Sequence, residues 1–243
     1  MKNKINRLIA ITVFVVLCLS FPEYMLGQGQ IKRQRQARQE SVQISNPDGY
    51  INGHGYVDLG LPSGTKWATC NIGAFDSTGV GDFFAWAETS AIYKEGEYHR
   101  KNTDLGNIAG QLQYDAATYN WGNPWKMPNT WQLEELIDVC KWKYVDYEGK
   151  KGYIITGPNK KSIFLPSGGR KINNQIYYDG YHSLNYWSAS PHESGRNYPA
   201  AMSDFNSGNK PAKVWWVEYF FASDGKPMTS EDKYIAYNIR AVL

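Results

Sequence analysis

The sequence predicts an α+β fold in which two short helices pack on antiparallel strands. Three observations lead to this prediction. Two segments with helical patterning lie in the first two thirds of the chain, many short strand-like segments follow them, and turn residues separate these segments. Aromatic residues make up 15% of the 243 residues and charged residues 20%, which is typical of a folded domain with a large aromatic core.

The first 27 residues predict an export signal. Lys2, Lys4 and Arg7 form a basic start, and an apolar run of 14 residues follows at positions 8–21. This run is shorter than the about 20 residues that a membrane-spanning helix needs. We therefore expect cleavage after Gly27 and an exported protein that is secreted, periplasmic or at the cell surface. After cleavage no membrane span is expected, and an uncleaved anchor is the alternative.

Residues 28–48 form a polar, basic segment without apolar periodicity, which we interpret as a flexible arm. The signal and the arm together hold seven of the 26 Lys and Arg residues and three of the 23 Asp and Glu residues. The predicted domain, residues 49–243, therefore has 19 basic and 20 acidic residues and a net charge near −1. This balance argues against nucleic acid as a partner of the folded part.

The first half of the domain predicts three strands and two helices. Residues 56–59 and 66–72 are expected to form strands on the two sides of a Pro-Ser-Gly turn, and the aromatic segment 81–89 a third strand. Residues 114–122 predict a short helix that ends at a glycine. A second helix is expected to start at Asn129, with Gln132 completing a weak capping box and with one buried stripe: Leu133, Leu136, Ile137 and Cys140.

The second half predicts mainly strands. Segment 141–156 is expected to form a hairpin about Glu148-Gly149, and segment 157–160, "GPNK", a turn into the next strand. Further strands are expected in "IYYDG", "NYWSAS", "VWWVEYFF" and "YIAYNIRAV". Residues 191–213 are interpreted as a long polar loop.

Seven blocks of this sequence carry a resemblance to a known family: "YVDLGLPSGTKWATCNIGA", "GDFFAWAET", "DAATYNWGNPWKMPN", "LEELIDVCKW", "GYIITGPNKKSIFLPSGG", "YWSAS" and "NIRAV". In this order they resemble the Fibrobacter succinogenes major paralogous domain of Bacteroidetes surface and secreted proteins, over about residues 50–243. The resemblance implies a C-type-lectin-like fold with long loops in the C-terminal half. The chain departs from the family pattern at "MPN", at "IRAV" and in residues 191–213, which are longer than usual and in this fold lie near the ligand face.

The sequence predicts no catalytic residue, no metal and no cofactor. Adjacent helical residues point about 100° apart, so Glu134 and Glu135 do not form a glycosidase pair, and we interpret them as acidic charge near a helix start. Formylglycine-generating relatives use a C-terminal cysteine pair, but no cysteine follows Cys140. The segment 157–159 lacks the acidic ligand of a calcium lectin. Cys70 and Cys140 fit either a disulfide or two buried free thiols.

Tyrosine and asparagine enrichment in the C-terminal half predicts a ligand-binding surface. Such side chains suit protein epitopes and sugar rings, because tyrosine offers a large contact area at low entropic cost. The predicted binding residues are Tyr177, Tyr178, Tyr181, His182, Arg196, Tyr198 and Asn206, with Asn185 and Tyr186 in the same stretch. Trp187, Trp215 and Trp216 are expected in the core. We therefore expect an exported, non-catalytic binder of a glycan or protein; the alternative is a structural module of a surface appendage, which would show an unpaired edge strand.

Overall fold

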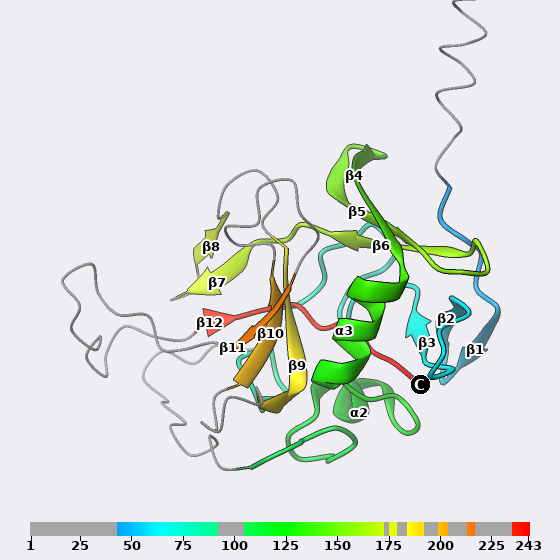
Figure 1. The fold of residues 1–243 in the computed structure, drawn as a ribbon. Helices are drawn as coiled ribbons and strands as arrows, with labels where there is room; N and C mark the ends of the chain where they lie inside the picture. Colours follow the sequence, from blue (N-terminus) through cyan, green and yellow to red (C-terminus); the bar gives the residue numbers. More distant parts are fainter. Residues whose placement is uncertain are drawn as a thin grey trace, which may run out of the picture. The chain divides into compact units, whose positions relative to one another are not determined.

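The computed structural model describes residues 43–91, 105–172, 175–178, 184–191, 199–203, 213–216 and 235–243. Residues Ile44–Leu243 form one compact unit. Its described part is a mixed α+β domain with two helices and several small antiparallel sheets (Figure 1). The predicted α+β class is therefore confirmed. Within the described residues, no helix has the length and the apolar character needed to cross a membrane.

The described strands form four antiparallel sheets of three strands each. One sheet has the order β1 (Gly49–Ile51), β2 (His54–Asp58), β3 (Lys66–Ala68). Another has the order β4 (Lys141–Tyr147), β5 (Lys150–Thr156), β6 (Ser162–Pro166). A third has the order β12 (Ile235–Ala236), β7 (Arg170–Ile172), β8 (Gln175–Tyr177). The fourth has the order β11 (Lys213–Trp216), β10 (Pro199–Ser203), β9 (Asn185–Pro191).

The hairpin between β4 and β5 forms where the sequence predicts it. Tyr147 pairs with Lys150, and the two residues between them, Glu148 and Gly149, have φ angles of 52° and 76°. A two-residue turn with both central φ angles positive matches the right-handed twist of the strands that it joins. The Glu-Gly pair therefore fixes the register of this sheet.

Helix α2 (Ala116–Trp121) is built around the buried carboxylate of Asp115. This side chain caps the helix by accepting hydrogen bonds from the backbone N–H groups of Ala117 and Thr118. It also accepts from the N–H groups of Gly110, at 2.7 Å, and Met127, at 2.9 Å. One carboxylate thus joins three chain segments, and α2 ends at Gly122 as predicted.

Helix α3 (Thr130–Val139) begins at the predicted residue. Asn129 Oδ1 accepts from the Gln132 N–H, and Gln132 Oε1 accepts from the Asn129 N–H, which completes the capping box. Leu133, Leu136 and Cys140 are buried in one core cluster as predicted, whereas Ile137, the fourth residue of the predicted stripe, is only partly buried against it. The helix packs against the sheet of β9, β10 and β11 (Figure 1).

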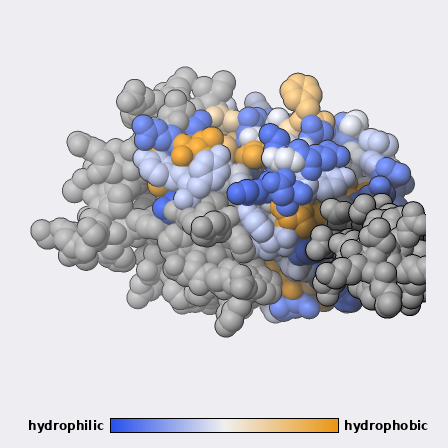
Figure 2. Space-filling model, turned by 90° about the horizontal axis from the view of Figure 1, so that it is seen from above, coloured by the Kyte–Doolittle hydropathy of each residue, from blue (hydrophilic) through white to orange (hydrophobic). Residues whose placement is uncertain are grey.

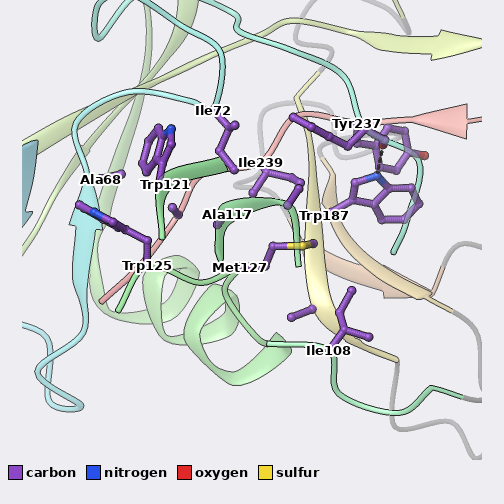
Figure 3. Packing of buried hydrophobic residues seen from close by; sticks show 14 of the residues in the cluster. Ala68, Ile72, Ile108, Ala117, Trp121, Trp125, Met127, Trp187, Tyr237 and Ile239 are labelled. Atoms are coloured by element: carbon purple, nitrogen blue, oxygen red, sulfur yellow. Dashed lines mark hydrogen bonds between the residues drawn. The ribbon is translucent and has the colours of Figure 1, made fainter. Parts of the chain in front are cut away.

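A second core cluster is rich in aromatic side chains. Figure 3 shows Trp121 and Trp125 at one side of this cluster and Trp187 and Tyr237 at the other. Trp187 is buried as predicted, and its indole N–H donates to the backbone oxygen of Phe84. The side chains of Trp215 and Trp216 lie outside what the structure describes.

The segment 235–243 runs between the sheets. Val242 forms antiparallel bridges to Trp67 in β3 and to Lys126, and Tyr237 forms one to Phe84. Asn238 forms a parallel bridge to Tyr186 in β9, and β12 pairs with β7. This segment therefore makes backbone contacts with three of the four sheets.

Two predicted elements are wrong. Segment 81–89 was expected to form a strand, but in it only Phe84 makes an isolated bridge, because positive φ angles at Gly81 and Ala87, 72° and 65°, turn the chain at both ends. Residues 191–213 were expected to form a loop, yet Pro199–Ser203 form β10, the middle strand of its sheet. The sequence of β10, Pro-Ala-Ala-Met-Ser, lacks the β-branched and aromatic residues that usually mark a strand.

The end of the predicted arm bonds to the domain. The Ser45 N–H donates to the Ser162 backbone oxygen at 2.9 Å, and the Ser162 N–H donates to Ser45 Oγ at 2.8 Å. Asp48 forms an ion pair with Lys161, and this hydrogen-bonded contact holds the pKa of Asp48 below its usual range. The fold thus includes residues before position 49.

Candidate functional site

The structure describes two of the seven residues predicted to bind a ligand. Tyr177 is the last residue of β8 and is 42% exposed, and Tyr178 follows it and is 65% exposed. The other five lie outside the described residues: Tyr181, His182, Arg196, Tyr198 and Asn206. The predicted surface thus contains an exposed pair of tyrosines, and its remaining part stays a prediction.

Tyr177 ends β8, a strand that is exposed on both faces, and Tyr178 follows it. Ile176, the neighbour of Tyr177, is 48% exposed, although adjacent residues of a strand point to opposite faces. On the other side of Tyr177, Gly169 approaches so closely that an added Cβ would lie 2.4 Å from the Tyr177 backbone oxygen. Only glycine fits there, where the Tyr178 ring also lies close by, and the side chains of Ile176, Tyr177 and Tyr178 nevertheless remain exposed. We call these three residues the tyrosine edge.

Asn185 and Tyr186 do not belong to the binding surface. Both are buried, unlike Tyr177 and Tyr178 of the same tyrosine- and asparagine-rich stretch. The Tyr186 hydroxyl donates to the Pro166 backbone oxygen at 3.1 Å and accepts from Asn71 Nδ2 at 3.0 Å. Burial raises the pKa of Tyr186 to about 12. Its role is to connect β9 with the end of β6 through the core.

A buried arginine completes this internal network, and sequence reasoning missed it. Arg240 is 1% exposed. Its Nε donates to Asn71 Oδ1 at 2.8 Å, its Nη1 to the Ala68 backbone oxygen at 3.0 Å and its Nη2 to the Phe164 backbone oxygen at 2.8 Å. Burial lowers its pKa, and none of the carboxylates in the described residues forms an ion pair with it. The signal in the sequence is a single arginine inside the apolar run "NIRAV".

Cys70 and Cys140, the two cysteines within the described residues, are free thiols. Cys140 belongs to the core cluster around α3, while Cys70 packs against the second, aromatic cluster. Burial raises the pKa of Cys140 to about 11. Of the two alternatives for these residues, the structure has the unpaired one, with the thiols serving as small apolar side chains.

Residues 157–160 form a turn, as predicted. The Lys160 N–H donates to the Gly157 backbone oxygen at 3.0 Å. Asn159 Nδ2 donates to the Asp58 backbone oxygen at 2.8 Å, and Asn159 Oδ1 accepts from the Lys161 N–H at 3.0 Å. Asn159 Nδ2 therefore holds the turn against β2, while Asn159 Oδ1 stabilises the turn itself. In the described part of the chain, no group of three or more His, Cys, Asp or Glu side chains is placed to hold a metal ion.

An open hollow of about 540 Å³ lies beside the start of α3. Its walls come from the loop between β2 and β3, from α3, and from the two paired segments that contain Lys126 and Leu243. We call it the Trp131 hollow, after the indole at its rim, which is 67% exposed. The polar side chains that line it include Ser63, Thr65, Lys126, Gln132 and Glu135.

A chain of hydrogen bonds runs along one wall of the Trp131 hollow. The Glu135 carboxylate accepts from the Ser63 N–H at 2.8 Å and from the Ser63 hydroxyl. Because an ionised carboxylate only accepts, the Ser63 proton points to Glu135. The Thr65 hydroxyl, 2.7 Å from Ser63 Oγ, then donates to Ser63 and accepts from Gln132 Nε2 at 3.2 Å. Glu135 thus binds the β2–β3 loop to α3, a more specific role than the general helix-start charge predicted for it.

No protein family, no curated protein and no solved structure matches the chain. The family resemblance and the lectin-like fold that it implies therefore stay predictions. The functional argument rests on the two surfaces described above, the tyrosine edge and the Trp131 hollow.

Proposed function

We propose that this chain is an exported, non-catalytic binding domain of the Fibrobacter succinogenes major paralogous family, with a C-type-lectin-like fold. It recognises a glycan or protein ligand through the surface of its C-terminal half, without a cofactor. The single observation that supports this function best is the tyrosine edge, where three consecutive large side chains are 42% to 65% exposed.

The exposure of these side chains favours ligand contact over packing. Large apolar residues usually become buried on folding, and exposed aromatic residues of this kind mark binding sites when they cluster. On the face shown in Figure 2, the coloured hydrophobic residues lie in small separate areas among hydrophilic ones. Tyr177 and Tyr178 each offer a flat ring and a hydroxyl group, which suits sugar rings and protein epitopes alike.

A glycan array tests this proposal. The full-length protein is screened with calcium and again with a chelator, beside a Tyr177→Ala/Tyr178→Ala variant and a Tyr50→Ala control. Tyr50 is 68% exposed and lies in β1, outside the tyrosine edge. We expect binding that the chelator leaves unchanged, that the double variant loses and that the control keeps. Binding that the double variant keeps would contradict a site at the tyrosine edge.

The alternative function is an assembly module, and one observation favours it. In the described residues β8 is the last strand in the order of its sheet, and its middle residue Ile176 is 48% exposed. An exposed apolar edge strand is a template for pairing with another chain. Sedimentation analysis of the full-length protein and of Ile176→Lys tests this alternative: a self-association that the variant abolishes would favour assembly over ligand binding.

A further inference from the structure

We propose that the Trp131 hollow is a second binding site, and that its ligand is a neutral saccharide. The site lies beside α3 and the β2–β3 loop, apart from the tyrosine edge. This proposal uses contacts that the tyrosine edge does not share, so it can be tested independently of the function proposed above.

The backbone under the aromatic wall of this site is held in place by hydrogen bonds. Trp131 lies between Asn129 and Gln132, whose side chains bond to each other's backbone N–H groups in the capping box. The backbone that carries the indole is therefore fixed, yet the side chain is 67% exposed. An exposed indole on a fixed helix start presents a flat, electron-rich face, against which the polarised C–H groups of a sugar ring pack favourably.

The polar wall offers hydrogen-bond acceptors at the right place. Trp131 and Glu135 are four residues apart on α3, so they lie on the same face of the helix. Ser63 occupies one acceptor position on each oxygen of the Glu135 carboxylate. A carboxylate has about four acceptor positions, so each oxygen keeps one for a ligand. Acceptors beside an aromatic face select a ligand with O–H donors next to a C–H surface, which describes a pyranose.

The contacts of Glu135 also orient it before any ligand arrives. The chain from Gln132 through Thr65 and Ser63 ends on this carboxylate, and hydrogen bonds in such a chain strengthen one another. Thr65 is 5% exposed, so the chain is anchored in the protein and not in solvent. A ligand therefore meets a preorganised acceptor, which lowers the entropic cost of binding.

The charged side chains of the hollow are compatible with a neutral ligand. One cationic and one anionic side chain, Lys126 and Glu135, line it together with polar residues and with Leu243, the last residue of the sequence. Lys126 and Glu135 do not form an ion pair with each other in the described part of the chain. A metal ion would need several carboxylates, and Glu135 would repel an anion. Lys126 instead supplies donors to hydroxyl or ring oxygens opposite the acceptors of Glu135.

Calorimetric titration of the full-length protein tests this site. The probes are glucose, galactose, mannose, N-acetylglucosamine and their short oligomers, up to millimolar concentration. We expect saturable binding of at least one of them, weakened at least about tenfold by Trp131→Ala and by Glu135→Gln. Tyr119→Ala is the matched control for Trp131→Ala, because Tyr119 is a helical aromatic residue, 58% exposed, outside the hollow. It is expected to bind as the unmodified protein does.

Thermal unfolding is measured for every variant to show that each is folded. The variant Trp131→Phe keeps an aromatic face and is expected to retain most of the affinity for the saccharide. The Tyr177→Ala/Tyr178→Ala variant separates the two proposals, because it is expected to leave binding in the hollow unchanged. The inference is overturned if none of these saccharides binds, if Trp131→Ala binds as tightly as the unmodified protein, or if the loss appears only in the tyrosine double variant. Binding of a peptide in place of a saccharide would equally overturn it.

Discussion

Replacing Arg240 by methionine is expected to destabilise the domain, although it removes a buried charge. The guanidinium is 1% exposed and donates to three acceptors: Asn71 Oδ1, the Ala68 oxygen and the Phe164 oxygen. Each buried acceptor that loses its donor costs about 1–3 kcal/mol, so the three together cost about 3–9 kcal/mol. Removing the charge returns several kcal/mol, because a buried ion without an ion-pair partner is itself unfavourable.

We expect a net loss of unfolding free energy of a few kcal/mol, and a loss of about 2–4 kcal/mol lowers the melting temperature of a domain of this size by about 5–15 °C. Urea unfolding followed by tryptophan fluorescence measures it, with an unchanged dependence on denaturant showing that the fold is retained. Arg240→Lys is expected to lose at least as much, because lysine keeps the charge but lacks the planar fork that reaches three acceptors. Lys161→Met, at an exposed ion pair, serves as control and is expected to change stability by less than about 1 kcal/mol. A methionine variant as stable as the original protein, or a lysine variant that fully replaces the arginine, would refute this reasoning.

Three further predictions follow from buried groups. Asp115→Ala leaves the four backbone N–H groups that it binds without an acceptor, and urea unfolding is expected to show a loss of about 3 kcal/mol or more. Cys140, whose pKa burial raises to about 11, is expected to be alkylated about 100-fold more slowly at pH 8 than an ordinary thiol, as mass spectrometry of the labelled protein would show. Burial raises the pKa values of Cys140 and Tyr186 to about 11 and about 12, so between pH 9 and 12 the folded protein keeps protons that the unfolded chain has already lost. The contribution of these two groups to stability is therefore complete below about pH 9 and is lost as the pH rises from 9 to 12. Urea unfolding at several pH values measures this loss.

A specific result would contradict each of these three predictions. If Asp115→Ala unfolds like the original protein, water or a neighbouring group has replaced the carboxylate. Labelling of Cys140 at the rate of a thiol in the urea-unfolded chain would show that it is accessible and not buried. Stability that stays level between pH 9 and 12 would mean that the unfolded chain holds these protons as strongly as the fold does.

Local signals in the sequence predicted local structure well. Residues close in sequence decide the hairpin at Glu148-Gly149 and the capping box of Asn129 and Gln132, and both formed where expected. Strand β10 was missed because its sequence carries no local preference; its pairing with β9 and β11 on both sides makes it a strand.

The candidate surfaces depended on contacts that no local pattern shows. Tyr186 and Tyr177 both occur in aromatic, strand-like segments, yet only Tyr177 is exposed. Tyr186 is buried because its strand β9 lies between the two core clusters, with Tyr186 in one cluster and Trp187 in the other. Strand β8, which contains Tyr177, is exposed on both faces. The Trp131 hollow depends on Ser63 and Glu135, which are 72 positions apart in the chain. Helical spacing predicts that Glu134 and Glu135 point in different directions, but it could not show that Glu135 would bind Ser63.

The segment 235–243 also determines when this domain can become folded. It pairs with β3, β7 and β9, and Arg240 reaches the backbone of β6, so all four sheets depend on it. During synthesis these residues emerge after every strand that they join. Until then the strands synthesised earlier have apolar faces that are incompletely covered, and partly folded chains of this kind are prone to aggregate. Contacts between residues so distant in sequence also slow folding. This delay keeps the chain unfolded until its last residues have left the ribosome, and an unfolded chain is the form that the export proposed above requires.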